Sequence, residues 1–138
     1  ADPGVEVITL EIPMPPSELS PNARRKWKSI ASTKQARYDA RVAAQSAIWN
    51  WCRANHDSQW VHLKEPVTAT VTFELKTKRR RDFDNMFLML KPTWDGFVDA
   101  GLLQDDSCWK LQFVLKVALK PTREPQVRIE LREFEENG

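Results

Sequence analysis

Four segments of the chain alternate between apolar and polar residues, which is the pattern of a strand with one buried face. The clearest runs from Val67 to Leu75, and a second runs from Leu111 to Leu119. Shorter alternations cover residues 8–12 and 127–131. The first of these ends at Pro13, because proline has no N–H to donate to a neighbouring strand. We predict a strand at each of the four segments.

Two further segments repeat their apolar residues at helical spacing. The longer one follows residues 32–33, a Ser-Thr pair that can cap a helix, and fades near Asn55. The shorter one lies within residues 85–100, is interrupted or restarted at Pro92, and ends at Gly101, a residue favoured just after a helix. The order strand, helix, strand, helix, strand, strand predicts an α+β fold, a two-layer sandwich whose mixed sheet carries two main helices on one face.

The composition favours a single globular domain. The chain has 138 residues, 41% of them hydrophobic, with six Trp, six Phe and a net charge of only +2. Such a chain can bury a core of its own, so disorder is disfavoured. No repeat and no Gly- or Ser-rich linker divides it, so residues 1–138 are predicted to form one domain. Residues 1–4 are left out of the fold argument as a candidate expression remnant.

Several classes of protein are disfavoured. No apolar run approaches the roughly 20 residues that cross a bilayer, so no membrane partner is expected. Cys52 and Cys108 provide neither a disulfide framework nor a zinc site, and His56 and His62 are too few for a His-rich metal site. We expect a soluble protein of a reducing compartment, located in the cytoplasm.

The positive charge is concentrated in two runs. Residues 22–41 hold seven Lys or Arg against Asp39 alone, and residues 76–81 hold five cations in six positions. Either run by itself is typical of a solvated surface segment. Because the second run leads directly into a cluster of carboxylates, the two together favour a surface that binds a polyanion such as DNA.

Carboxylates follow the second basic run. On an extended backbone, residues two apart point to the same side, so Asp82 and Asp84 are expected to converge. The pair Asp105-Asp106 comes after the second helix, on the way into the next strand, and we expect it at the same end of the sheet. Three carboxylates would offer Mg²⁺ or Mn²⁺ an oxygen-rich site. The alternative is that Asp84 caps a helix and Asp105-Asp106 forms a turn, which leaves Asp82 unexplained.

A lysine on the second helix completes the charged cluster. Lys91 precedes Asp95 by four residues, and Asp99 follows on the same helix face, so either carboxylate could pair with it. By itself Lys91 is typical of a solvated helix position.

These residues together resemble the RusA-like Holliday junction resolvases. The similarity is carried by Arg79-Arg80-Arg81-Asp82-Phe83-Asp84-Asn85, by Lys91-x-x-x-Asp95, by Ala100-Gly101 and by Asp105-Asp106. A weaker match is Pro13-x-Pro15-Pro16-Ser17, followed by an Asn and a basic stretch. The matched blocks span most of the predicted fold in order.

The resemblance implies a homodimeric nuclease that resolves four-way (Holliday) DNA junctions by paired phosphodiester hydrolysis with Mg²⁺ or Mn²⁺. It implies that Asp82, Asp84 and Asp106 bind the metal and that Lys91 is the essential lysine. The gap before Lys91 is longer than in the family pattern, and without this insertion the position would be Leu88, which we expect to pack inward. The residues expected to contact DNA are Asn22, Arg24, Arg25, Lys26, Lys28, Arg79, Arg80 and Arg81.

Two other functions stay open at this point. The first is a DNA-binding protein that keeps the RusA fold but does not cut, against which the intact set of three aspartates counts. The second is a module whose basic face binds an acidic protein, which would show a weak salt dependence of DNA affinity.

Overall fold

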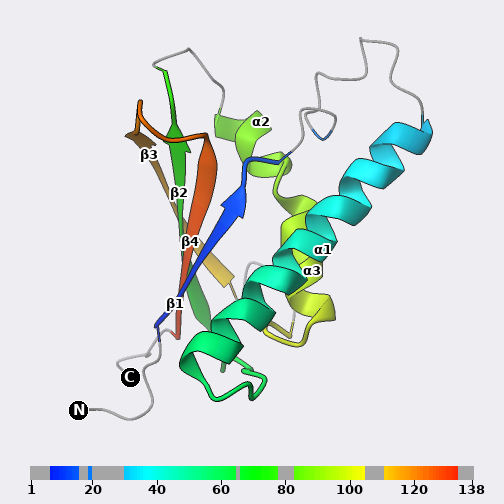
Figure 1. Ribbon diagram of the computed structural model, residues 1–138, viewed down its shortest axis with the longest axis vertical. Helices are drawn as coiled ribbons and strands as arrows, with labels where there is room; N and C mark the ends of the chain where they lie inside the picture. The colour runs from blue at the N-terminus through cyan, green and yellow to red at the C-terminus, as the bar shows by residue number, and fades with distance from the viewer. Residues whose placement is uncertain are drawn as a thin grey trace.

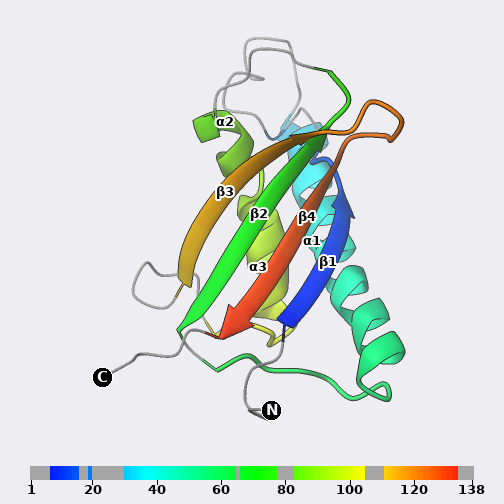
Figure 2. The same ribbon diagram turned by 90° about the vertical axis from the view of Figure 1, so that its left-hand side faces the viewer.

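Figures 1 and 2 show the computed structural model of the chain, which describes residues 7–15, 19, 30–64, 66–77, 83–104 and 111–133. Along these residues the elements are β1 (Val7–Pro13), α1 (Ile30–Asn55), β2 (Val67–Leu75), α2 (Phe83–Leu88), α3 (Lys91–Asp99), β3 (Leu111–Leu119) and β4 (Gln126–Glu133). The predicted order of elements is confirmed, with α2 and α3 as the two parts of the interrupted second helix.

The strands form one mixed sheet in the order β1-β4-β2-β3. β4 is antiparallel to both β1 and β2, whereas β3 is parallel to β2. In Figure 2 the sheet lies in front of α1, α2 and α3, so the helices share one face of the sheet. The predicted α+β two-layer sandwich, with a mixed sheet and helices on one face, is therefore confirmed.

The core lies between the sheet and the helices. In β1, β2 and β4 buried residues alternate with more exposed ones, as the pattern predicted, except at Glu74 of β2, which is itself buried. The register joins the buried positions into rows that cross the strands, such as Leu10, Ile129 and Val71. β3 continues these rows at the edge of the sheet, where its apolar side chains become more exposed toward Leu119. Burial of such rows is the main source of stability of a two-layer fold.

α1 packs on the sheet through buried residues at every fourth position, namely Ala36, Ala40, Ala44, Ile48 and Cys52. Because the first three are small, α3 can approach closely. A Cβ added at Gly96 of α3 would lie 2.8 Å from the carbonyl oxygen of Arg41 and 2.9 Å from the Cβ of Ala44. The glycine therefore sets how closely the two helices cross.

We expect Gly96→Ala to lower the free energy of unfolding by about 1–3 kcal/mol, the usual cost of an overpacked contact. The expected loss comes despite the gain of about 1 kcal/mol that alanine gives over glycine within a helix. Urea denaturation followed by circular dichroism would measure it. An unchanged or higher midpoint would contradict the close crossing at this position.

The helix ends correct several details of the sequence interpretation. α1 begins at Ile30, so neither Ser32 nor Thr33 is its cap. α2 begins at Phe83, so the backbone of Asp84 is helical, and Asp84 neither caps the helix nor continues an extended strand. The predicted end of α3 is confirmed, because Ala100 is its C-cap and Gly101 follows with φ of 77°.

Glu74 is a buried carboxylate on the sheet face that carries no helix. Its side chain is only 1% exposed and accepts a hydrogen bond from Gln126 Nε2 at 2.5 Å. Arg128 Nη2 lies 3.4 Å from Glu74 Oε2 and 3.6 Å from Glu11 Oε1. The hydrogen bond from Gln126 lowers the pKa of Glu74, and the charge of Arg128 adds to this effect, while burial opposes it.

Because folding lowers the pKa of Glu74, its ionised form stabilises the fold above the usual carboxyl pKa of about 4.3, and that contribution is lost as the pH falls through the folded value. We expect Glu74→Gln to cost about 1–3 kcal/mol at neutral pH, and the difference from the parent to shrink below about pH 4. The matched change Glu130→Gln on the same sheet face should have little effect. Urea unfolding at several pH values would measure both, and a pH-independent difference would contradict the role of the charge.

None of the helices in the described part of the chain combines the length and the apolar character that crossing a membrane would need.

Candidate functional site

Most of the predicted site lies outside the described residues. This holds for the predicted metal ligands Asp82 and Asp106, and for the predicted DNA contacts Asn22, Arg24, Arg25, Lys26, Lys28, Arg79, Arg80 and Arg81. The structure gives the backbone of Asp84 in α2 and the full side chain of Lys91 in α3. The surroundings of these two residues are the part of the site that the structure describes.

The sheet topology changes how the aspartates can be related. β2 and β3 are adjacent, as expected, but they run parallel, so the end of β2 and the start of β3 lie at opposite edges of the sheet. The strand ends therefore do not by themselves bring Asp82, Asp84 and the Asp105-Asp106 pair together, and their meeting stays a prediction. Any meeting of the three must depend instead on how α2 and the segment before β3 are placed.

α2 lies over the first part of β3. The rings of Phe87 in α2 and Phe113 in β3 meet edge to face, with centroids 4.8 Å apart. Phe113 also contacts Trp94 of α3 at 5.0 Å. This aromatic contact holds the helix that contains Asp84 against the strand that follows the Asp105-Asp106 pair in sequence. Leu88, in the last turn of α2, is 53% exposed, so the expectation that it packs inward is wrong.

Trp94 and Phe97 bury one side of α3 in the core. Trp94 is 3% exposed, and its ring lies edge to face with that of Phe97 at a centroid distance of 5.4 Å. The buried indole Nε1 of Trp94 has no hydrogen-bond partner. The apolar side of α3 is thus fixed in the core, which leaves its charged residues on the opposite side.

Lys91 and Asp95 form the predicted ion pair. Lys91 Nζ lies 3.1 Å from Asp95 Oδ1, with side-chain exposures of 59% and 35%. Pro92 occupies the first turn of α3, where its missing N–H costs no hydrogen bond. The carboxylate therefore orients an ammonium group that remains accessible to a ligand at the start of the helix.

Asp99 pairs with α1 and not with Lys91. Arg41 donates hydrogen bonds to Asp99 Oδ2 from Nη2 and, at 3.0 Å, from Nε. The hydrogen bond to Asp99 raises the pKa of Arg41, and the negative charges of Asp99 and Asp95 add to it. Charges thus alternate along the crossing of α1 and α3, from Asp99 through Arg41 and Asp95 to Lys91.

The interpretation of the sequence missed the role of Arg41. It counted this arginine within the first basic run but assigned it no partner, because Asp99 lies 58 positions away. Only the helix crossing at Gly96 brings the two together, and no local pattern reports such a contact.

The donor set predicted for a metal fits Mg²⁺ or Mn²⁺ in its chemistry, because three carboxylates offer the hard oxygen ligands that these ions prefer. Within the described part of the chain, no three Asp, Glu, His or Cys side chains form a group that could hold a metal. The side chains of Asp82, Asp84 and Asp106 are outside that part, so the ligand assignment stays a prediction.

No protein-family model matches the chain. An uncharacterised protein of Xylella fastidiosa (strain Temecula1 / ATCC 700964) is 33% identical to it over 101 residues. The aligned region is 72% of this chain and 61% of that protein, so the chain spans less than two thirds of the length of this relative.

Proposed function

We propose that this protein is a metal-dependent, structure-selective endodeoxyribonuclease that resolves four-way DNA junctions by paired phosphodiester hydrolysis. The observation that carries the proposal is the motif block of three arginines, Asp82-x-Asp84-Asn85, Lys91-x-x-x-Asp95 and Asp105-Asp106. Two features of the fold support it. Lys91 and Asp95 form an ion pair at the motif spacing, and α2 lies against β3 through Phe87 and Phe113.

In this proposal the aspartates bind the metal and the lysine stabilises charge on the phosphate. Asp82, Asp84 and Asp106 would hold Mg²⁺ or Mn²⁺, which supplies Lewis-acid stabilisation of the phosphate and lowers the pKa of an attacking water. Lys91, oriented by Asp95, would donate to the phosphate oxygens on which negative charge develops.

The basic residues would hold the substrate. Phosphate contacts position a protein on DNA without reading its sequence, which suits an enzyme that selects branched structure. We assign this role to the arginine run before Asp82 and to the basic segment of residues 22–28.

The substrate also bears on assembly and location. A four-way junction has two opposed strands to cut, and a two-fold homodimer would present two sites to them symmetrically. We propose that the protein acts as a homodimer in the cytoplasm of a bacterial or phage-infected cell, where such DNA is found.

The test is incubation of the protein with a mobile synthetic four-way junction in Mg²⁺, Mn²⁺ or EDTA. Paired, symmetric nicks that need the metal are the expected result, with linear duplex of the same sequence left intact. Tight junction binding without nicking in either metal would favour the non-cutting DNA-binding protein. DNA affinity that barely depends on salt would favour the module for an acidic protein partner.

A further inference from the structure

The first half of α1 exposes an unusual group of side chains. Lys34, Arg37, Tyr38 and Arg41 are all exposed, and at about 100° per residue they fall within an arc of about 100°. We call these four residues the basic arc. Asp39 lies on the other side of the helix, where Gln35 Nε2 donates a hydrogen bond to its Oδ1 at 2.8 Å.

Within the described residues, two cations of the basic arc have no carboxylate partner. Arg41 is neutralised by Asp99, whereas neither Lys34 nor Arg37 forms an ion pair with any residue in the described ranges. Elsewhere in these ranges, Lys91 is paired with Asp95 and Arg128 with Glu74. Unpaired positive charge on one helix face favours an anionic ligand.

Tyr38 adds an aromatic surface between these charges. Its side chain is 63% exposed, the largest value among the exposed large apolar residues of the described chain. A cationic face with an exposed ring is the combination by which proteins bind unpaired nucleotides, because the cations contact phosphates and the ring stacks on a base. An acidic protein partner would offer Tyr38 no base on which to stack.

We propose that the basic arc binds branched DNA, with Lys34 and Arg37 on backbone phosphates and Tyr38 stacked on an unpaired base at the branch point. This inference rests on the proposed function, since it names further contacts to the same substrate. Arg41 would act as a support, because its hydrogen bonds to Asp99 tie the arc to α3, the helix that begins at Lys91. The basic arc thereby adds contacts in α1 to the DNA contacts that the sequence predicts.

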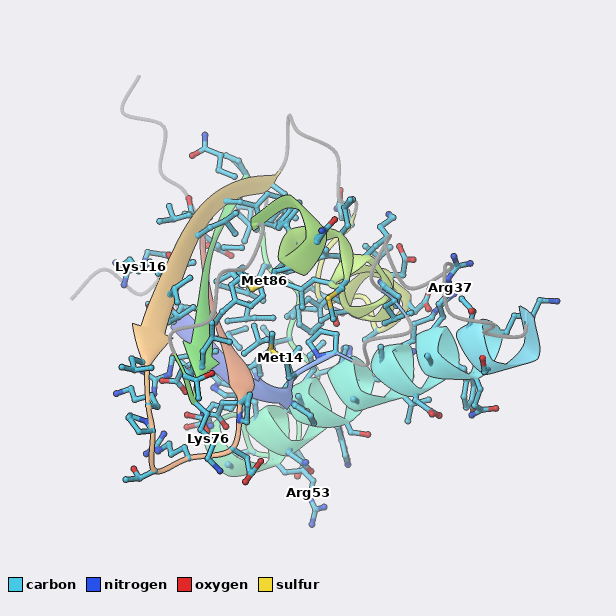
Figure 3. The ribbon with its side chains drawn as sticks, turned by 90° about the horizontal axis from the view of Figure 1, so that it is seen from above. Met14, Arg37, Arg53, Lys76, Met86 and Lys116 are labelled. Atoms are coloured by element: carbon cyan, nitrogen blue, oxygen red, sulfur yellow. The ribbon has the colours of Figure 1, made fainter. Side chains whose placement is uncertain are left out.

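The test uses the full chain and a labelled four-way junction in EDTA, with affinity measured by fluorescence anisotropy at several salt concentrations. Lys34→Ala combined with Arg37→Ala should make the slope of log affinity against log salt shallower by up to about 1.8, which corresponds to two phosphate contacts. The matched control is Arg53→Ala, because Arg53 is an exposed arginine of the same helix that projects away from Arg37 in Figure 3. A double variant with the parent slope, or an equal change in Arg53→Ala, would overturn the proposal.

Tyr38 requires a separate measurement. Tyr38→Ala should weaken junction binding by about 5- to 100-fold without changing the salt slope, whereas Tyr38→Phe should bind like the parent. On a blunt linear duplex, which offers no unpaired base, the two variants should bind equally. Equal loss on both probes, or no loss on the junction, would overturn the stacking role. Circular dichroism would verify that each variant is folded.

Cleavage in Mg²⁺, assayed separately, distinguishes the two proposals. If the parent binds through the basic arc but never nicks, the proposed function fails and the arc stands. If the parent nicks and the arc variants bind like the parent, the arc fails and the proposed function stands. A parent that binds no DNA would overturn both.

Discussion

Asp82→Asn should abolish cleavage of a four-way junction while leaving junction binding intact or tighter. Replacing a carboxylate with an amide removes one negative ligand from the proposed metal site, and Mg²⁺ depends strongly on charged oxygen ligands. The same change lessens the repulsion between the protein and the DNA phosphates. Cleavage and binding are therefore expected to move in opposite directions, which general misfolding would not produce.

The experiment needs three measurements on the same preparation: the single-turnover cleavage rate, the junction affinity in EDTA, and Mn²⁺ binding by calorimetry. Asp57→Asn is the matched control, because Asp57 is exposed and has φ of 50°, a conformation that asparagine also accepts. The control should cut and bind like the parent. If Asp82→Asn cleaved at a near-normal rate with metal bound, the metal-site assignment would be wrong.

The strands were predictable because one physical signal dominates them. Val67–Leu75 and Leu111–Leu119 have the bounds that strict alternation gave. β2 buries one side against the helices along its length, and β3 does so most fully at Leu111. The order of the strands was not predictable in the same way. Alternation is a local property, whereas the pairing of β4 between β1 and β2 depends on the whole chain.

The candidate site was predictable in its chemistry and less so in its geometry. The four-residue spacing of Lys91 and Asp95 correctly predicted their ion pair, because helical spacing alone places them together. The start of α2 at Phe83 invalidated the argument that Asp82 and Asp84 lie on one extended strand. Leu88 was expected inside and is exposed, since the packing of a six-residue helix is decided by its neighbours and not by its own pattern.

Lys91→Ala should lower the single-turnover rate of junction cleavage by about 10²- to 10³-fold, the usual loss when one donor to a developing negative charge is removed. Stability should hardly change, because the side chain is 59% exposed and exposed ion pairs contribute little. Saturating protein separates this effect from weaker binding. Lys116→Ala is the matched control, since Lys116 is an exposed lysine of β3 (Figure 3) and should leave the rate unchanged.

A second variant separates the effect of the Lys91 ammonium group on the cleavage rate from the effect of its orientation by Asp95. Asp95→Asn keeps the charge of Lys91 but removes the carboxylate that lies 3.1 Å from its Nζ. If Lys91 stabilises charge at the scissile phosphate, this variant should lose less activity than Lys91→Ala, because the lysine keeps its charge and can still reach the phosphate at an entropic cost. The resemblance to RusA-like resolvases offers Leu88 as the alternative position, and Leu88 has no charge to offer. Equal rates for Lys91→Ala and the parent would show that the lysine is only a surface charge and that the resemblance to RusA-like resolvases does not extend to it.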